Sequence, residues 1–185
     1  MLIPFFRLRK RKHPLIIGVL SALCLPLLLH ASTGFAKTEQ DIKVAYLFNF
    51  MKFITWPSYE NIDSFNLCIL GEDPVNEKLK KLKGRPINNQ KLEVIELIKP
   101  DANYQCHVVF VGESEKKFTR DIVDFYSHTP TLTVSSMENF TNNGGMIGFI
   151  TLGNIIRFNI NLKQARQTQL SISSKLLELA NQVEQ

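Results

Sequence analysis

The sequence has 185 residues and a formal excess of basic residues, with 22 Lys and Arg against 17 Asp and Glu. Five of the 22 basic residues and none of the acidic ones lie within residues 1–36, so residues 37–185 carry 17 charges of each sign and no net charge. This balance argues against a nucleic-acid-binding protein, because that function needs a concentrated basic face.

Residues 1–36 have the pattern of a secretory signal peptide. The basic stretch RLRKRKH (7–13) precedes the apolar stretch PLIIGVLSALCLPLLL (14–29), and small residues follow up to Ala36. This order predicts export and cleavage after Ala36. The alternative is an N-terminal membrane anchor, although the apolar stretch is shorter than the roughly 20 residues of a membrane span and contains Pro26.

Residues 37–185 are long enough to form one domain, and they contain two cysteines, Cys68 and Cys106. An even number of cysteines in an exported chain suggests a single disulfide. Both cysteines lie at or near the start of an expected core strand, so the bond can form if those strands are neighbours. It would close a loop of about 38 residues and contribute roughly 3–4 kcal/mol. Two buried free thiols are the alternative.

The first expected element of this domain is a helix over 39–55, within which VAYLFNFMKFITWP (44–57) begins. Thr38 and Asp41 form an N-cap signature, and Pro57 ends the segment, because a residue before proline is pushed out of the α region. A long strand is the weaker alternative. Apolar residues cover nearly the whole helix, so we expect one face to pack on a sheet and part of the rest to bind a partner.

Strands and helices then alternate along the chain. Apolar runs predict strands at 65–71, 91–98, 106–112 and 131–136, and a hairpin is predicted at 146–162 with its turn at Gly153-Asn154. Helices are expected from Asp73-Pro74 to Gly84, after Ser114 with Phe118, Ile122 and Phe125 as apolar positions, after Ser135 with Glu138 in a capping box, and over 173–184. We therefore predict an α/β fold: a single three-layer domain, with a mostly parallel sheet, helices on both faces and a C-terminal antiparallel hairpin at one edge.

Signatures of catalysis are sparse, and we predict no catalytic residue, no metal site and no cofactor. Neither His107 nor His128 has a second ligand at metal-binding spacing, and no nucleophile elbow, P-loop or dinucleotide fingerprint occurs. A ligand crevice is possible at the carboxyl ends of the parallel strands, where open α/β sheets bind ligands. Its candidate residues are Gly71, Glu72, Gly112, Glu113 and Ser135.

Several stretches resemble the YfiR family of periplasmic proteins, in the same order along most of residues 37–185. They are AYLFNFMKFITWP, LCILGEDP, CHVVFVGESE, NNGGMIGFI and IRFNINLKQARQTQLSISSKLLELA. The resemblance implies a compact α/β domain that can dimerise and that inhibits a membrane-bound diguanylate cyclase, with relief through sequestration by an outer-membrane lipoprotein. It also matches Cys68 and Cys106 to the family's shared disulfide. A further cysteine pair of some members is absent here near 140–150, which puts any control through that pair in doubt.

The leading hypothesis is therefore a non-catalytic periplasmic regulator that lowers cyclic di-GMP signalling and biofilm formation by binding a cyclase's periplasmic domain. A small-molecule-binding module is the alternative, and a hydrolase that uses the crevice carboxylates is a third reading. The expected partner-binding residues lie on the first and last helices: Tyr46, Phe48, Phe50, Phe53, Trp56, Leu176 and Leu179.

Overall fold

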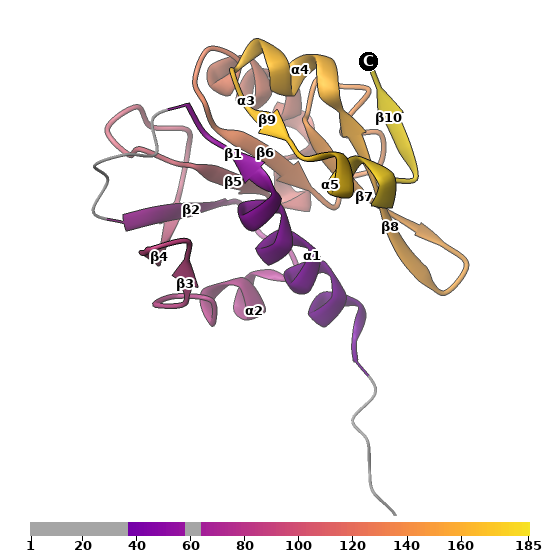
Figure 1. Ribbon diagram of the computed structural model, residues 1–185. Helices are drawn as coiled ribbons and strands as arrows, with labels where there is room; N and C mark the ends of the chain where they lie inside the picture. The colour runs from indigo at the N-terminus through magenta and orange to yellow at the C-terminus, as the bar shows by residue number, and fades with distance from the viewer. Residues whose placement is uncertain (1–36, 58–63) are drawn as a thin grey trace, which may run out of the picture. The chain divides into compact units, whose positions relative to one another are not determined.

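The computed structural model describes residues 37–57 and 64–185, and the predicted signal peptide, residues 1–36, lies outside the described residues (Figure 1). Residues 37–185 cluster as one unit. Among the helices of the described residues, none is both long and apolar enough to cross a membrane.

An eight-stranded mixed sheet with the strand order β10-β8-β7-β6-β5-β2-β4-β3 is the centre of the fold. Neighbouring strands are parallel from β4 through β2, β5 and β6 to β7, whereas β3 pairs antiparallel with β4 and β8 antiparallel with β7. The bounds are β2 Ser64–Leu70, β3 Pro86–Ile87, β4 Gln90–Leu97, β5 Val108–Val111, β6 Leu132–Ser135, β7 Ile147–Leu152, β8 Ile155–Asn161 and β10 Gln182–Glu184. A separate antiparallel pair joins β1 (Ile54–Thr55) to β9 (Ser171–Ile172).

Helices contact both faces of this sheet. The bounds are α1 Glu39–Phe53, α2 Asn76–Lys80, the 3₁₀ helix η2 Glu113–Phe118, α3 Thr119–Tyr126, α4 Leu162–Gln167 and α5 Ser174–Leu179. The larger core cluster contains buried residues of α1, α2, α4 and α5, and the second contains Ile122, Val123 and Tyr126 of α3. The central strands β5 and β6 are buried along their whole length, as expected for strands covered on both faces.

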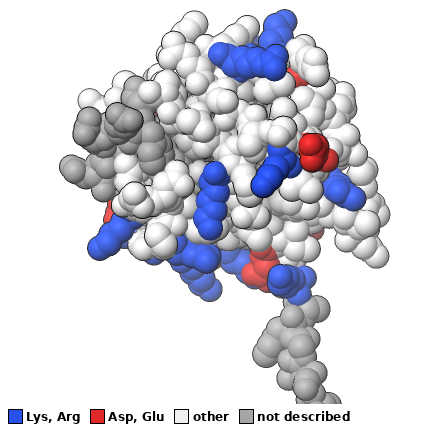
Figure 2. Space-filling model, in the orientation of Figure 1, with Lys and Arg blue, Asp and Glu red and all other residues white. Residues whose placement is uncertain are grey.

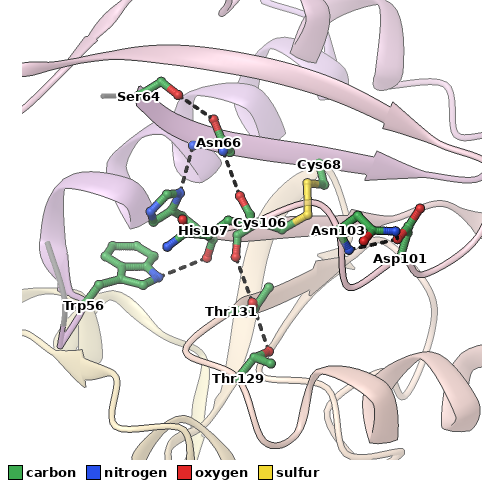
Figure 3. Close-up of a disulfide and its surroundings, with 11 residues drawn as sticks. Trp56, Ser64, Asn66, Cys68, Asp101, Asn103, Cys106, His107, Thr129 and Thr131 are labelled. Carbon is green, nitrogen blue, oxygen red and sulfur yellow. Dashed lines mark hydrogen bonds between the residues drawn. A yellow bond between two sulfur atoms is a disulfide. The ribbon is translucent and has the colours of Figure 1, made fainter. Parts of the chain in front are cut away.

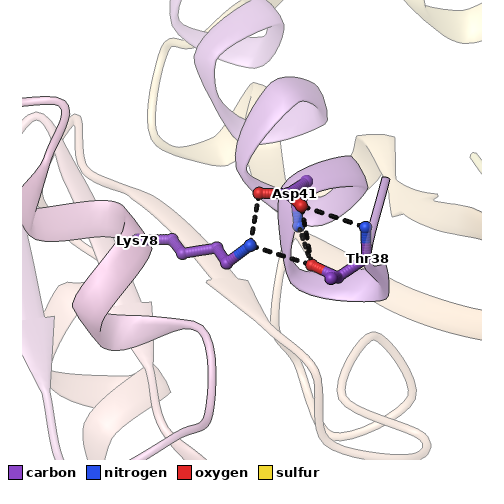
Figure 4. Close-up of polar contacts among 3 residues, drawn as sticks. All are labelled: Thr38, Asp41 and Lys78. Carbon is purple, nitrogen blue, oxygen red and sulfur yellow. Dashed lines mark hydrogen bonds and ion pairs between the residues drawn. The ribbon is translucent and has the colours of Figure 1, made fainter. Parts of the chain in front are cut away.

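Helix α1 begins with the predicted capping residues. The backbone N–H of Thr38 donates to Asp41 Oδ2 at 2.9 Å, and the backbone N–H of Asp41 donates to Thr38 Oγ1 at 3.3 Å. The ammonium of Lys78, on α2, also contacts both side chains (Figure 4). The hydrogen bond from Lys78, together with those from Thr38, holds the pKa of Asp41 well below its usual range. The capping box therefore also ties α1 to α2.

The α/β fold is confirmed, whereas the predicted layering and sheet edge are confirmed only in part. The hairpin β7–β8 forms with its turn at Gly153, but it is not the edge of the sheet, because β10 pairs with β8 on the outer side. The expected helix after Ser135 is wrong. The Ser135 hydroxyl donates to Val111 O at 2.7 Å and accepts from the backbone N–H of Met137 at 3.0 Å, and Asn139 has φ 58°, which a helix does not permit.

The expected helix over 173–184 is correct only for its first half. Helix α5 ends at Leu179, and Ala180 has an extended backbone with ψ 147°. The backbone N–H of Asn181 then donates to Phe158 O at 2.8 Å, which places the following residues beside β8 as the strand β10. The short helix α4 lies in a segment for which no helix was expected, and its cap comes from Asn161, whose Oδ1 accepts from the backbone N–H of Gln164 at 2.9 Å.

Candidate functional site

The Cys68–Cys106 disulfide connects neighbouring strands, which confirms the predicted bond. Cys68 lies within β2 and Cys106 precedes β5, and their Cα atoms are 5.7 Å apart. The strands run parallel with Cys68 opposite Val109, and the disulfide joins β2 to the residues just before β5 (Figure 3). Both cysteines are buried within the second core cluster.

His107 follows the disulfide directly and is held by three neighbours. Its ring stacks on Phe65 with 4.6 Å between centroids, and its Nδ1 accepts from the backbone N–H of Asn66 at 2.9 Å. The backbone carbonyl of His107 accepts from Trp56 Nε1 at 3.0 Å (Figure 3). Since Nδ1 accepts, the neutral ring carries its proton on Nε2, which has no hydrogen-bond partner among the described residues. Burial lowers the pKa of His107 to about 4.

This pKa predicts a loss of stability at mildly acidic pH. His107 has an ordinary pKa of 6.5 when unfolded and about 4 when folded, so between these values the unfolded chain binds a proton that the folded chain excludes. The contribution of neutral His107 to the free energy of unfolding should therefore be fully present above pH 6.5. On acidification to pH 4 the free energy of unfolding should fall by up to about 3 kcal/mol. Urea denaturation of the wild type and His107→Gln at several pH values measures this, and the variant should show a shallower decline. Equal slopes would contradict the assignment to His107.

A cavity of about 410 Å³ lies beside the disulfide, at the amino ends of β5 and β6. Its rim is fixed by hydrogen bonds, since Thr131 Oγ1 donates to Cys106 O at 2.8 Å and Asn66 Nδ2 donates to Gln105 O at 2.8 Å. The lining residues are Trp56, Asp101, Ala102, Tyr104, Gln105, Cys106, His107, Phe125, Tyr126, Thr129, Pro130 and Thr131. They come from three separate segments, so no local sequence pattern indicates this cavity.

The predicted crevice at the opposite, carboxyl ends of the strands is only partly assembled. Gly71, Glu72 and Glu113 line one open depression, which three further carboxylates share: Asp73, Glu77 and Glu96. Burial, and then the charge of Glu113, raise the pKa of Asp73. No group of three or more His, Cys, Asp or Glu residues suited to a metal occurs in the described part of the chain.

Gly112 and Ser135 do not line this depression. A Cβ at Gly112 would lie 2.6 Å from Glu72 O, so glycine is needed where the two strand ends touch. Ser135 is fully buried and its hydroxyl is occupied by backbone groups. The expected cap at Ser114 is also wrong: its hydroxyl accepts from the backbone N–H of Glu72 at 2.8 Å and so joins the two strand ends. These backbone contacts between the turns therefore leave Gly112 and Ser135 outside the depression that Gly71, Glu72 and Glu113 line.

Three of the predicted partner-binding residues belong to the core. Phe50, Trp56 and Leu176 are at most 4% exposed. Trp56 packs edge-to-face on Phe65 with 5.0 Å between centroids, and its Nε1 donates a hydrogen bond to the backbone carbonyl of His107. These three side chains are therefore covered by the fold. Phe50 alone of them lies on α1, and it belongs to the face that was expected to pack on the sheet.

The other four predicted residues remain accessible to different degrees on α1 and α5. Tyr46 and Phe48 are half-buried, whereas Phe53 is 37% and Leu179 53% exposed. The Phe48 ring lies beneath two cations, with Lys52 Nζ 4.5 Å and the Arg85 guanidinium carbon 4.4 Å from its centroid. We call the surface of Phe48, Phe53 and Leu179 the α1–α5 surface. Its binding role stays a prediction.

A second exposed apolar area occurs on the α3 side, where the sequence predicted core. Ile98, Phe118 and Phe125 are 100%, 56% and 40% exposed and line a groove beside η2 and α3. Phe118, Ile122 and Phe125 were expected as apolar positions of one helix, and of the three only Ile122 is buried. Phe118 ends the 3₁₀ helix η2, which advances the chain by a different angle per residue than an α-helix, so Phe118 is out of phase with α3.

Charge is unevenly distributed over the surface. Figure 2 shows that Lys and Arg predominate over Asp and Glu on the face that carries α1 and α5. Carboxylates instead gather around the depression at the carboxyl ends of β2 and β4. The domain is neutral as a whole, yet the α1–α5 surface lies on a basic face.

Comparison with known proteins identifies one family. The model of a family described as YfiR/HmsC-like matches residues 40–181, which is more than half of the chain. The matched region extends from the first turn of α1 to the residue before β10. No curated protein matches the chain.

Proposed function

The chain belongs to the YfiR/HmsC-like family, and from that premise we propose that it is a non-catalytic periplasmic regulator that inhibits a membrane-bound diguanylate cyclase. In this role it binds the periplasmic domain of the enzyme, holds it in an inactive arrangement, and so lowers cyclic di-GMP signalling and biofilm formation. The observation that carries the proposal is the family match over 40–181, which includes nearly all of the described fold.

The α1–α5 surface is the part of the molecule that we propose to bind the cyclase. It combines accessible apolar side chains with neighbouring cations, since Phe53 and Leu179 are exposed and Lys52 lies over Phe48. A basic rim around an apolar centre fits a partner surface that is apolar with acidic residues at its edge. Rim charges of this kind steer association, so binding should weaken as salt is raised.

Two further partners belong to the same proposal. An outer-membrane lipoprotein would relieve the inhibition by sequestering the regulator, and a second copy of this chain would form a homodimer. Light scattering of the purified protein over a range of concentrations measures the second of these directly.

A deletion experiment tests the function itself. Deleting the gene in cells that express the cyclase should raise cyclic di-GMP, and re-expression of the wild type should restore the lower level. Unchanged cyclic di-GMP in the deletion strain, with the cyclase detected by immunoblot, would overturn the proposed inhibition.

The α1–α5 surface yields a specific prediction. Phe53→Glu with Leu179→Glu should weaken binding to the cyclase's periplasmic domain about tenfold or more, because two apolar contacts are replaced by charges that must be desolvated. Titration calorimetry with the isolated periplasmic domain measures the affinity. Both residues are exposed, so circular dichroism and thermal unfolding should stay close to the wild type.

Ile98→Glu supplies the matched control for this pair. It introduces the same charge at a fully exposed apolar residue on the α3 side. We expect unchanged cyclase affinity for this variant. If Ile98→Glu lost cyclase binding and the α1–α5 variant kept it, the interface would have to lie on the α3 side. The proposed function would not be affected by that result.

A further inference from the structure

Among the described residues that line the cavity beside the disulfide, Asp101 carries the one formal charge. The other ionisable base among them is His107, and burial keeps its ring neutral at physiological pH. Asp101 Oδ1 accepts from the backbone N–H of Asn103 at 2.9 Å and from its Nδ2 at 2.8 Å. These bonds hold the carboxylate in place without neutralising it, since Asp101 has no ion pair among the described residues.

Aromatic side chains form much of the remaining wall. Trp56, Tyr104, Phe125 and Tyr126 all line the cavity. In Figure 3, Trp56 and Asp101 lie on either side of the disulfide, whereas Tyr126 is close enough for the charge of Asp101 to affect its pKa. A molecule that contacts both Asp101 and Trp56 must therefore carry its charge away from the part that packs on Trp56.

The fold also leaves two polar groups of the lining unpaired. The hydroxyl of Tyr126 and Nε2 of His107 have no hydrogen-bond partner among the described residues, although these side chains are only 3% and 5% exposed. Buried polar groups are normally satisfied, so an unpaired pair beside one cavity points to a ligand. The charge of Asp101 also reaches Tyr126, whose pKa is raised to about 12, first by burial and then by that carboxylate.

We propose that this cavity binds a small organic monocation with a flat apolar body, its ammonium group towards Asp101 and its body towards Trp56 and Phe125. A carboxylate with aromatic neighbours attracts a cation through both charge and the ring faces. An anion would face the carboxylate, and the described residues of the lining offer no charged base to compensate. A neutral ligand would displace water from the carboxylate without supplying an opposite charge to offset the cost of desolvation.

Three probes that share a phenyl ring and differ in the charge of the head group test this assignment. They are 2-phenylethylammonium, 2-phenylethanol and phenylacetate. The chain has a single tryptophan, and it lines the cavity, so fluorescence of Trp56 reports occupancy without a label. With protein expressed from the full sequence, the ammonium probe should change the fluorescence saturably and bind about tenfold more tightly than the alcohol. Phenylacetate should bind more weakly still.

Asp101→Asn isolates the charge, because asparagine keeps an oxygen that can accept both bonds from Asn103. It should remove the roughly tenfold preference for the ammonium probe over the alcohol. Phe125→Ala should weaken all three probes, and Phe125 is 40% exposed, so the fold should survive. Asp124→Asn is the control for the loss of a carboxylate. Asp124 lies on α3 beside Phe125 but outside the cavity lining, so this variant should leave all affinities unchanged.

Three results would overturn the proposal. The first is equal affinity for the ammonium and phenylacetate probes, and the second is an unchanged ammonium preference in Asp101→Asn. The third is no binding of the ammonium probe, which saturation-transfer NMR on the same samples detects if the fluorescence does not respond. The measurement uses the purified chain alone, so its outcome is independent of whether the cyclase is the partner.

Discussion

Replacing Phe50 with alanine should lower the free energy of unfolding by about 3–5 kcal/mol. Phe50 is fully buried in the last turn of α1, and its ring lies 4.9 Å from Phe158 and 5.8 Å from Phe149 between centroids. Both partners come from the hairpin β7–β8. Removing the ring therefore loses apolar burial and leaves a cavity where the helix meets the sheet. Urea denaturation followed by circular dichroism measures the change.

Phe53→Ala is the natural control for this variant. It makes the same chemical change one turn along α1, but at a side chain that is 37% exposed. We expect a loss of less than about 1 kcal/mol there. Similar losses in the two variants would contradict the assignment of Phe50 to the core and Phe53 to the α1–α5 surface.

Loss of the disulfide should have an effect of similar size. Cys68 and Cys106 are separated by 38 residues, and the chain-entropy model gives about 3–4 kcal/mol for a closed loop of this length. Reduction frees the unfolded chain to sample more conformations, whereas the folded sheet changes little. We therefore expect dithiothreitol to lower the urea midpoint of the wild type with little change in secondary structure before unfolding.

The double variant Cys68→Ala/Cys106→Ala separates this effect from other actions of the reductant. Its stability should be close to that of the reduced wild type, with a further loss from two smaller buried side chains, and dithiothreitol should not change it. A midpoint of the oxidised wild type equal to that of the double variant would contradict the expected contribution.

Features that depend on neighbouring residues could be predicted from the sequence. The capping box is one, because Thr38 and Asp41 satisfy each other within a single turn. The β7–β8 hairpin is another, since Gly153 takes the positive φ that its turn requires. The disulfide followed from two cysteines in or beside expected core strands that prove to be neighbours, although Cys68 lies within β2 and not at its start.

Features that depend on distant residues could not be predicted. An all-apolar helix such as α1 has no polar stripe to mark its outer side, so the sequence does not separate Phe50 from Phe53. The cavity needs Trp56, the segment before β5 and the segment before β6 to meet at one place. The predicted ligand crevice depended on the general behaviour of parallel strand ends, and in this chain the close contact of Gly112 with Glu72 leaves Gly112 outside the depression that forms there.

The two outermost strands of the sheet have a consequence for how the protein avoids aggregation. At one edge lies β3, two residues long and beginning with Pro86, and at the other lies β10, three residues long and ending with Glu184. An exposed edge is a template on which another chain can add a strand, and short edges with proline or charge resist such addition. Without β10, the seven-residue strand β8 would become the edge. The strand β10 therefore protects the long strand β8 from the addition of strands from other molecules.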